Sequence, residues 1–565
     1  MSLQRTYTRL LQQAPPRKPT ILERDHRYRP AVVLQHARIG GFLIIAPSGA
    51  GKSIFMGKHI ALSDCQNHIP QIIIDVGGQC IENFLHACLF LSESEQRELL
   101  SRIVYCDMAG EEGFITSWPL LHSWSPEERL VVTASRLPEL LGLLDENFSN
   151  ATIQGLTRTI PIAVTTGKIL SALQLPITEV FSLLRQPEEW TDRIKEAVRR
   201  NPACTTAAAD MFDYMELPSR LRNERIEPFL NRLQLLQHDE ISRAMFGSIR
   251  APTIDFEKVT RSGQTVLIDL SGDRSKFSRQ FKLQFVFNLL LEYLAHRGRG
   301  AGPFSVLVDE LSFFVKGAAY VNTHAIAEQF RQLIEQNMRN NAVQLTLATQ
   351  DIKQIPEEML TACLNLKNFL FGSQSDPETA EYLANRFIQR DPWEVKYWER
   401  VWAAEQLSGM TQHFVIDHRP VFLPLEESLY INSRTFMNLP KGTWLFAESK
   451  GEGEVATSVK RITTRHLFQP PFASENKALV KRLRSYAIRK DGYPLADILG
   501  EIETDTLSHR SLPIVPGAQS DATHAATNGN VHQSEQETTN EQLAPVEQPP
   551  VVFLPGRKHH PKREE

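Results

Sequence analysis

The chain has 565 residues, of which 42% are hydrophobic and 23% are charged, a composition typical of a folded protein with a sizeable core. The formal net charge of −4 excludes a globally basic nucleic-acid binder, so any such contact must come from a local patch or an assembled pore. Six cysteines without a CxxC pair are too few for a disulfide framework and favour a reducing cytosol.

The first 35 residues are polar and basic, contain Pro15, Pro16 and Pro19, and are predicted to form an N-terminal arm. They lack the apolar core of a signal peptide. The most apolar runs, such as residues 285–295, are far shorter than the ~20 residues that a membrane span needs. We therefore expect a cytoplasmic protein, with any membrane association peripheral and made through a partner.

Short apolar runs that alternate with helical stretches begin at Phe42. Several are apolar almost throughout, as expected for strands that are buried on both faces of a parallel sheet. The pattern predicts an α/β fold with a mainly parallel, twisted sheet covered by helices on both sides. The runs are residues 42–46, 71–75, 102–106, 265–270, 305–309, 343–348, 366–371 and 443–447.

Residues 122–250 interrupt this pattern and are predicted to form a mostly helical inserted domain. They are rich in Leu, Arg, Glu and Ala, and residues 126–144, 150–166 and 187–200 have helical character. The α/β domain would then consist of residues 36–121 and 251–504, the second part including a C-terminal extension.

Two further segments of the chain differ in composition from the rest. Within the second part of the α/β domain, residues 388–435 are expected to be irregular and aromatic, and a helical pattern resumes near residues 475–490. Residues 505–565 are rich in Ser, Thr, Asn, Gln, Glu and Pro, and are predicted to be a disordered tail.

A phosphate-binding loop is predicted between the first strand and the helical stretch that follows it. The segment fits the pattern [AG]xxxxGK[ST], in which backbone N–H groups and a helix N-terminus surround phosphate oxygens. Lys52 would reach the β- and γ-phosphates of ATP, and the Ser53 hydroxyl would bind Mg²⁺. The loop consists of Ala46, Pro47, Ser48, Gly49, Ala50, Gly51, Lys52 and Ser53.

An apolar strand at residues 303–308 ends in two acids, Asp309 and Glu310. A P-loop ATPase needs a carboxylate near Mg²⁺, for which Asp309 is the candidate. Glu310 is the candidate base that polarises the attacking water. Two other strand-end acids compete: Asp75, which is better explained as a cap on the Gly77–Gly78 turn, and Asp269, which is better explained as structural.

The strand at residues 343–348 leads into Thr349 and Gln350, and Gln350 is the candidate sensor of the γ-phosphate. Arg339 lies just before this strand, where an arginine could project onto the γ-phosphate of a neighbouring subunit. The alternative is a solvated arginine that suits the C-terminal end of the preceding helix. Arg331 is a weaker candidate for the same role.

The ordered set of motifs resembles the FtsK/HerA superfamily of ring-forming DNA pumps, and within it the type IV secretion coupling proteins of the VirD4/TraG group. The resemblance spans residues 38–450. It rests on the P-loop, Asp309-Glu310 and Ala348-Thr349-Gln350, on the helical insertion after the third strand, on Met338-Arg339-Asn340-Asn341, and on the segment 375–383. It implies a RecA-like P-loop fold.

The resemblance also implies a function and a set of partners. Lys52, Ser53, Asp309, Glu310, Arg339 and Gln350 carry over as catalytic candidates that act with ATP and Mg²⁺. The protein would then be an ATP-driven homohexameric ring that translocates DNA, docked to a membrane secretion complex or to a relaxosome-like protein. The chain departs from the group in lacking membrane helices, and in having Asp75-Val76-Gly77-Gly78 where a lysine is common.

Other functions remain open from the sequence. The chain could be a VirB4-like ATPase that powers assembly or protein export, or a nucleotide-binding scaffold, although a scaffold has no need of Glu310. For DNA contacts, the candidates are Lys316 and the basic stretch 220–225, the latter being better explained as solvated arginines on a helix.

Overall fold

The computed structural model describes residues 20–25, 30–33, 35–121, 134–138, 153–248, 250–297, 301–315, 323–338, 341–388, 391–407, 410–448, 459–464 and 471–508. Within these ranges, none of the helices combines the length and the apolar character needed to cross a bilayer. All six cysteines are buried and carry free thiols.

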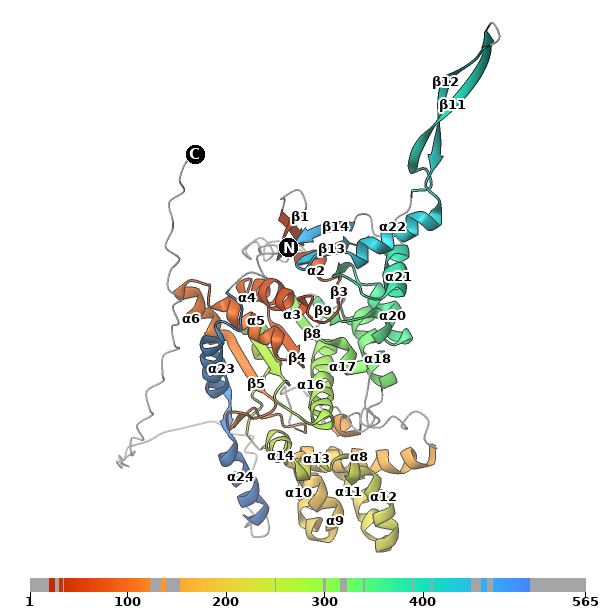
Figure 1. The fold of residues 1–565 in the computed structure, drawn as a ribbon. Coiled ribbons are helices and arrows are strands. Elements are labelled where there is room, and N and C mark those ends of the chain that lie inside the picture. Colours follow the sequence, from red (N-terminus) through yellow and green to blue (C-terminus); the bar gives the residue numbers. More distant parts are fainter. Residues whose placement is uncertain are drawn as a thin grey trace, which may run out of the picture.

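An eleven-stranded sheet forms the centre of the molecule (Figure 1). Seven neighbouring strands are parallel, and four antiparallel strands extend the sheet at one edge. The parallel strands in spatial order are β10 (Asn368–Phe371), β3 (Phe42–Ile45), β9 (Val343–Thr349), β8 (Phe304–Asp309), β4 (Gln71–Asp75), β7 (Thr265–Asp269) and β5 (Ile103–Asp107). The antiparallel ones, outward from β10, are β13 (Thr443–Glu448), β14 (Val459–Thr463), β1 (Thr20–Asp25) and β2 (Pro30–Val33).

The parallel strands are buried on both faces, as their apolar sequences predict. Alternate residues point into two cores: Phe42 and Ile44 of β3 into one, Leu43 and Ile45 into the other. The strand order places one strand, β9, between the P-loop strand β3 and the acid-ending strand β8. This is a RecA-like P-loop fold, as predicted.

Helices cover both faces of the sheet. The core that contains Phe42 and Ile44 is covered by one set of helices. These are the continuous segment α3 (Lys52–Phe55), η1 (Met56–Ala61) and α4 (Leu62–Gln66), together with α5 (Gln79–Cys88), α6 (Glu93–Arg102) and α23 (Lys477–Asp491). The helices over the other core are α16 (Lys276–His296), α17 (Leu311–Val315), α18 (Thr323–Gln332), η6 (Leu333–Asn337), α20 (Glu357–Leu364) and α21 (Pro377–Phe387). Asp376 caps α21 by accepting a hydrogen bond from the Thr379 N–H, with Pro377 in the first turn.

A helical region occupies the lower end of the molecule in Figure 1. Its elements are α8 (Ile153–Leu173), η3 (Ile177–Glu179), α9 (Val180–Arg185), η4 (Pro187–Trp190), α10 (Thr191–Arg200), η5 (Pro202–Cys204), α11 (Thr205–Met215), α12 (Ser219–Arg232), α13 (Leu235–His238) and α14 (Glu240–Gly247). Its buried side chains join the core under α16. Arg136 ties this region to α16 through two hydrogen bonds of 2.8 and 2.9 Å to the Glu292 carboxylate.

After α23 the chain returns to the helical region. A two-residue strand β15 (Tyr493–Pro494) pairs with β6 (Phe114–Ile115), and α24 (Leu495–Ser508) then packs against α14. Three further short helices are α2 (Gln35–Arg38), α15 (Phe256–Ser262) and η7 (Ile352–Gln354).

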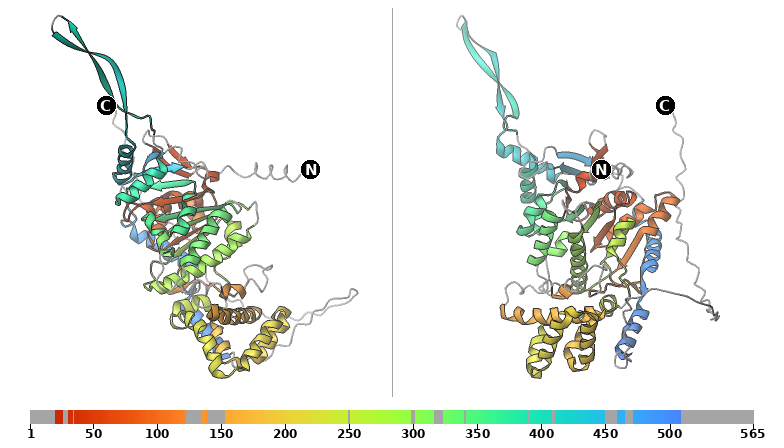
Figure 2. Two further views of the ribbon diagram at one scale, coloured as in Figure 1. Left: turned by 90° about the vertical axis from the view of Figure 1, so that its right-hand side faces the viewer. Right: turned by 180° about the vertical axis from the view of Figure 1, so that it is seen from behind.

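The expectation that residues 388–435 are irregular is wrong. They contain a long antiparallel hairpin, β11 (Val395–Leu407) and β12 (Met410–Phe422), followed by α22 (Leu425–Met437). The hairpin projects away from the body in every view (Figures 1 and 2). Two irregularities in its register, at Lys396 and Ile416, break the two-residue alternation that identifies a strand in a sequence.

Candidate nucleotide-binding site

The predicted phosphate loop joins β3 to the helix that starts at Lys52. Gly49 and Gly51 have φ of 77° and 103°, in the left-handed region that favours glycine. A Cβ added at Gly49 would meet no atom within 4 Å, so there is open space beside this residue. Because the loop leads directly into a helix N-terminus, its backbone N–H groups and the helix dipole favour a phosphate group there.

Lys52 lies against this loop and is only 7% exposed. Its ammonium group donates hydrogen bonds to the Ala46 carbonyl at 2.7 Å and the Pro47 carbonyl at 3.4 Å. Burial lowers the pKa of Lys52, and the nearby carboxylates of Glu310 and Asp309 oppose that shift. An anionic phosphate would give this buried cation the partner that two neutral carbonyls do not.

Ser53 and Asp309 are 256 residues apart in the sequence and meet where the parallel strands of the sheet end. The Ser53 hydroxyl donates a 2.6 Å hydrogen bond to Oδ2 of Asp309, which is 6% exposed. Burial raises the pKa of Asp309, and the Ser53 hydroxyl and Lys52 oppose the shift. In the described part of the chain no group of three or more His, Cys, Asp or Glu side chains could hold a metal ion. A hydroxyl and a carboxylate that meet at 2.6 Å are oxygen ligands of the kind that Mg²⁺ takes, with its other ligands coming from phosphate and water.

Glu310 has an uncommon backbone conformation, and hydrogen bonds fix its side chain. Its φ is 70°, which is uncommon for a residue with a side chain. One carboxylate oxygen accepts a hydrogen bond from the Gln350 amide at 2.9 Å, and the other accepts one from the Ser312 hydroxyl. The backbone and two hydrogen bonds therefore hold this carboxylate beside the Ser53–Asp309 pair.

Four strand-end aspartates form a row along the sheet edge. Asp309, Asp75, Asp269 and Asp107 occupy matching positions of β8, β4, β7 and β5. Asp75 caps its turn, accepting from the N–H groups of Gly77 at 3.0 Å and Gly78 at 2.8 Å, which supports the structural role expected for it. Burial, with Asp309 and Asp269 nearby, raises the pKa of Asp75 to about 8, although backbone N–H donors oppose the shift.

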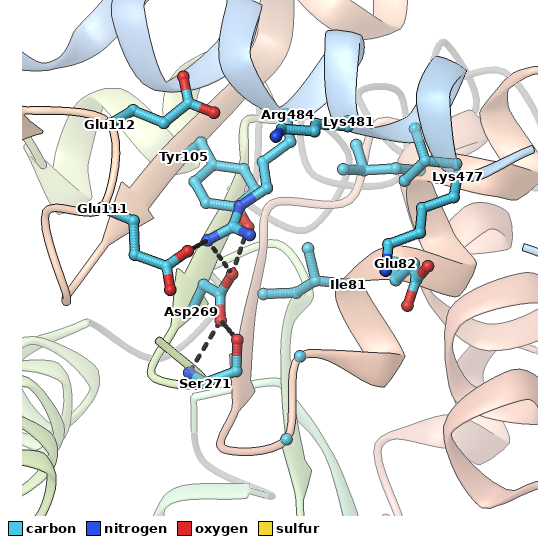
Figure 3. Close-up of a pocket in the computed structure, with 14 residues that line it drawn as sticks. Ile81, Glu82, Tyr105, Glu111, Glu112, Asp269, Ser271, Lys477, Lys481 and Arg484 are labelled. Atoms are coloured by element: carbon cyan, nitrogen blue, oxygen red, sulfur yellow. Dashed lines mark hydrogen bonds and ion pairs between the residues drawn. The ribbon is translucent and has the colours of Figure 1, made fainter. Parts of the chain in front are cut away.

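A polar pocket of about 460 Å³ lies beside Asp269 of this row and is lined by residues of α5, β5, β7 and α23 (Figure 3). Asp269 is at its centre and accepts hydrogen bonds from Tyr105 and from the Ser271 hydroxyl at 2.6 Å. Arg484 of α23 reaches Asp269 and Glu111, both at 3.2 Å. These mutual ion pairs and hydrogen bonds support a structural role for Asp269.

Four further candidates from the sequence are Arg339, Lys316, Arg331 and the basic stretch 220–225. Arg339 and Lys316 lie outside the described residues. Arg331 forms ion pairs with Glu328 and Glu335 of its own helical segment, at 2.7 and 2.8 Å. In the basic stretch, Arg220 is exposed and pairs with Glu224 at 3.2 Å, as expected for a solvated helix face, whereas Arg222 is mostly buried and pairs with Glu188 of η4.

Sequence reasoning missed Ser312 and the row of aspartates. Ser312 follows Glu310 by two residues, a spacing that suits a side-chain hydrogen bond at a helix start, so the signal was present but weak. Each aspartate ends an apolar run, but nothing in the sequence indicates that β8, β4, β7 and β5 are neighbours.

No protein-family model matches the chain, and no curated protein matches it. Among solved structures, an unbound form of the bacterial conjugative coupling protein TrwBdeltaN70 is 12% identical, with a TM-score of 0.46, over 82% of this chain and 94% of that one. TrwB in complex with ADP and Mg²⁺ is 11% identical, with a TM-score of 0.46 and coverage of 83% and 94%. VirB4 of Thermoanaerobacter pseudethanolicus is 14% identical, with a TM-score of 0.45 and coverage of 80% and 97%.

These structures include a coupling protein, the kind that the sequence motifs resemble, and a VirB4, the kind considered as the alternative. At such low identities and TM-scores the likeness carries no functional argument. What the protein does has to be inferred from the geometry of its own site.

Proposed function

We propose that this chain is an ATP-hydrolysing motor, and that Lys52, Ser53, Asp309 and Glu310 form its catalytic site. The proposal rests mainly on two hydrogen-bonded pairs of side chains that lie together where the parallel strands end. Ser53, at the end of the phosphate loop, contacts Asp309 at 2.6 Å, and Gln350 holds the adjacent Glu310 at 2.9 Å.

Each residue has a role that follows from its chemistry. Pro47, Ser48, Gly49, Ala50 and Gly51 provide the loop around the phosphates, and Lys52 neutralises charge that develops on the β- and γ-oxygens. Ser53 and Asp309 hold Mg²⁺, which supplies electrostatic stabilisation of the transferred phosphoryl group. Glu310 takes a proton from the attacking water, and Gln350 keeps its carboxylate in place while sensing the γ-phosphate.

We further propose that the motor is a homohexameric ring that moves DNA. Arg339 of one protomer would then complete the site of its neighbour, and backbone contacts would hold DNA without sequence preference. The ring would work in the cytoplasm, peripheral to a membrane secretion complex or beside a relaxosome-like partner. This part rests on the resemblance of the sequence motifs to the coupling proteins.

ATP hydrolysis measured with and without DNA, at low and moderate salt, tests the proposal. We expect turnover that depends on Mg²⁺ and rises on addition of DNA, with the stimulation weakening as salt increases because backbone contacts are electrostatic. Active turnover that is indifferent to both single-stranded and duplex DNA would instead favour a VirB4-like ATPase of secretion-machine assembly or protein export.

A further inference from the structure

The hairpin of β11 and β12 is the largest feature that the proposed catalytic site does not use. It stands clear of the body, beyond α22 (Figures 1 and 2). Lys396 at its base forms an ion pair of 2.6 Å with Glu427 of α22, which anchors it to the domain. A two-stranded hairpin with no third strand or helix against it is at best marginally stable in water. Both strands nevertheless extend for 13 residues, which indicates that the hairpin contacts a partner.

Large aromatic side chains on this hairpin are open to solvent. Trp398 is 59% exposed, Trp402 is 55% exposed and Tyr397 is 53% exposed. Isolated exposed apolar residues are ordinary, but two tryptophans and a tyrosine close together on one projecting strand mark an interaction surface. Their rings are flat and rigid, and they are held on extended backbone rather than in a core.

The register divides the charges between the two faces of the hairpin. Trp398 lies opposite Pro420, Arg400 opposite His418, and Trp402 opposite Val415. Since side chains alternate along a strand, these six share one face, which we call the tryptophan face. The opposite face carries Tyr397, Glu399 and Val401, with Glu399 opposite Arg419 and Val401 opposite Asp417. Between residues 397–404 and 413–421, the tryptophan face thus has basic residues and tryptophans, and the carboxylates lie on the other face.

We propose that the tryptophan face binds single-stranded DNA. Trp398 and Trp402 would stack on unpaired bases, and Arg400 between them would contact the phosphate backbone. Four residues of extended strand separate the two tryptophans by about 13 Å, enough for more than one nucleotide to lie between them. The inference rests on the proposed function in taking DNA as the substrate, and deepens it by assigning a site and a strand state.

The charges favour this occupant over a second copy of the chain. Two tryptophan faces packed together would bring Arg400 and His418 of each copy near the same residues of the other, with no carboxylate on that face to offset them. A phosphate backbone supplies the missing negative charge, and stacking suits solvent-exposed indole rings. Duplex DNA offers the phosphates but keeps its bases stacked and inaccessible.

The test uses the full-length protein and a fluorescein-labelled oligothymidylate of about 20 nucleotides, which is longer than typical single-strand site sizes. Fluorescence anisotropy compares the parent with the double variant Trp398→Ala/Trp402→Ala. Tyr397→Ala is the matched control, because it removes an equally exposed aromatic from the opposite face of the same strand. Anisotropy requires no turnover, so binding is measured whether or not DNA stimulates ATP hydrolysis.

We expect the double variant to bind the oligonucleotide at least about tenfold more weakly than the parent. Tyr397→Ala should bind within about twofold of the parent, and DNA-free ATP hydrolysis should be unchanged in both. Equal binding by the parent and the double variant, or equal losses in the double variant and Tyr397→Ala, would overturn the proposal. So would a change of oligomer size in the double variant with binding intact, since the face would then be a contact between copies.

Discussion

At the scale of single residues, the site depends on the position of one carboxylate. Glu310 has a φ of 70°, a conformation that costs on the order of 1–3 kcal/mol for a residue with a side chain. Such backbone persists only where the surroundings determine it, here through Gln350, Ser312 and the buried strand β8 that ends at Asp309. The strained conformation turns Glu310 out of the strand while Asp309 stays beside Ser53, so two adjacent acids serve two different functions.

The buried carboxyl group of Asp75 should make the stability of the protein depend on pH. Burial raises its pKa from 3.8 to about 8, so between these values the folded state retains a proton that the unfolded state releases. The contribution of Asp75 to the free energy of unfolding therefore falls as pH rises from about 4 to about 8, and it levels off above that. Asp75→Asn, which cannot ionise, should flatten that fall although its overall stability is lower.

The measurement is the apparent urea midpoint of nucleotide-free protein across that pH range, for the parent and for Asp75→Asn. Asp213→Asn, on the exposed side of α11, is the control and should follow the parent. Parallel curves for the parent and Asp75→Asn would show that Asp75 is ionised in the folded protein.

At the scale of elements, local patterns predict the strands well and their arrangement poorly. The apolar runs at residues 71–75 and 265–270 match β4 and β7 to within one residue, because strands buried on both faces are apolar throughout. The order of strands in the sheet depends on long-range packing, so the neighbours of Asp75 and Asp269 could not be predicted. The hairpin was missed because the side chains of residues 397–404 are largely exposed on both faces and its register is interrupted at Lys396 and Ile416.

The candidate site was predictable to a similar degree. The P-loop pattern and the two acids after an apolar run indicate chemistry from short segments, and the fold brings Ser53 and Asp309 together. Gln350 was singled out as a phosphate sensor, and its amide lies on Glu310, a contact that only the adjacency of β9 and β8 reveals. The roles of these residues in hydrolysis remain predictions.

The packing of α23 against the sheet should depend on the ion pair between Arg484 and Asp269. Arg484 pairs at 3.2 Å with Asp269, whose side chain is 4% exposed, so its loss leaves a buried carboxylate with fewer partners. Because Arg484 is itself partly exposed, we expect Arg484→Ala to lower the free energy of unfolding by about 2 kcal/mol, less than for a fully buried pair. Arg489→Ala is the matched control, an exposed arginine on the same helix whose nearest carboxylate atom, in Glu112, is 3.9 Å away.

Chemical denaturation followed by tryptophan fluorescence checks this prediction. Equal stabilities of Arg484→Ala and Arg489→Ala would mean that Tyr105 and Ser271 satisfy Asp269 without the arginine.

At the scale of the whole molecule, the proposed ring makes the catalytic site a shared one. Glu310 would act within its own protomer and Arg339 on the next. Arg339→Ala and Glu310→Gln should each be nearly inactive alone. If protomers mix at random, about a quarter of the sites in an equal mixture would have an intact Glu310 facing an intact Arg339.

Mixing the two variants should therefore restore up to about a quarter of the parent rate if sites act independently. A mixture of Arg339→Ala with Lys52→Ala offers the same complementation, whereas Glu310→Gln with Lys52→Ala should not recover, because both changes affect the same half of the site. Absence of recovery in every mixture would argue that Arg339 does not act across a subunit boundary.

The central claim is that Glu310 activates water for ATP hydrolysis at the Lys52–Ser53 loop. Its most direct test measures ATP turnover and the binding of a fluorescent ATP analogue for the parent and for Glu310→Gln. We predict that Glu310→Gln binds the analogue as the parent does but hydrolyses ATP at least about 100-fold more slowly. Equal, near-zero turnover in both proteins would contradict the account and indicate a nucleotide-binding scaffold instead.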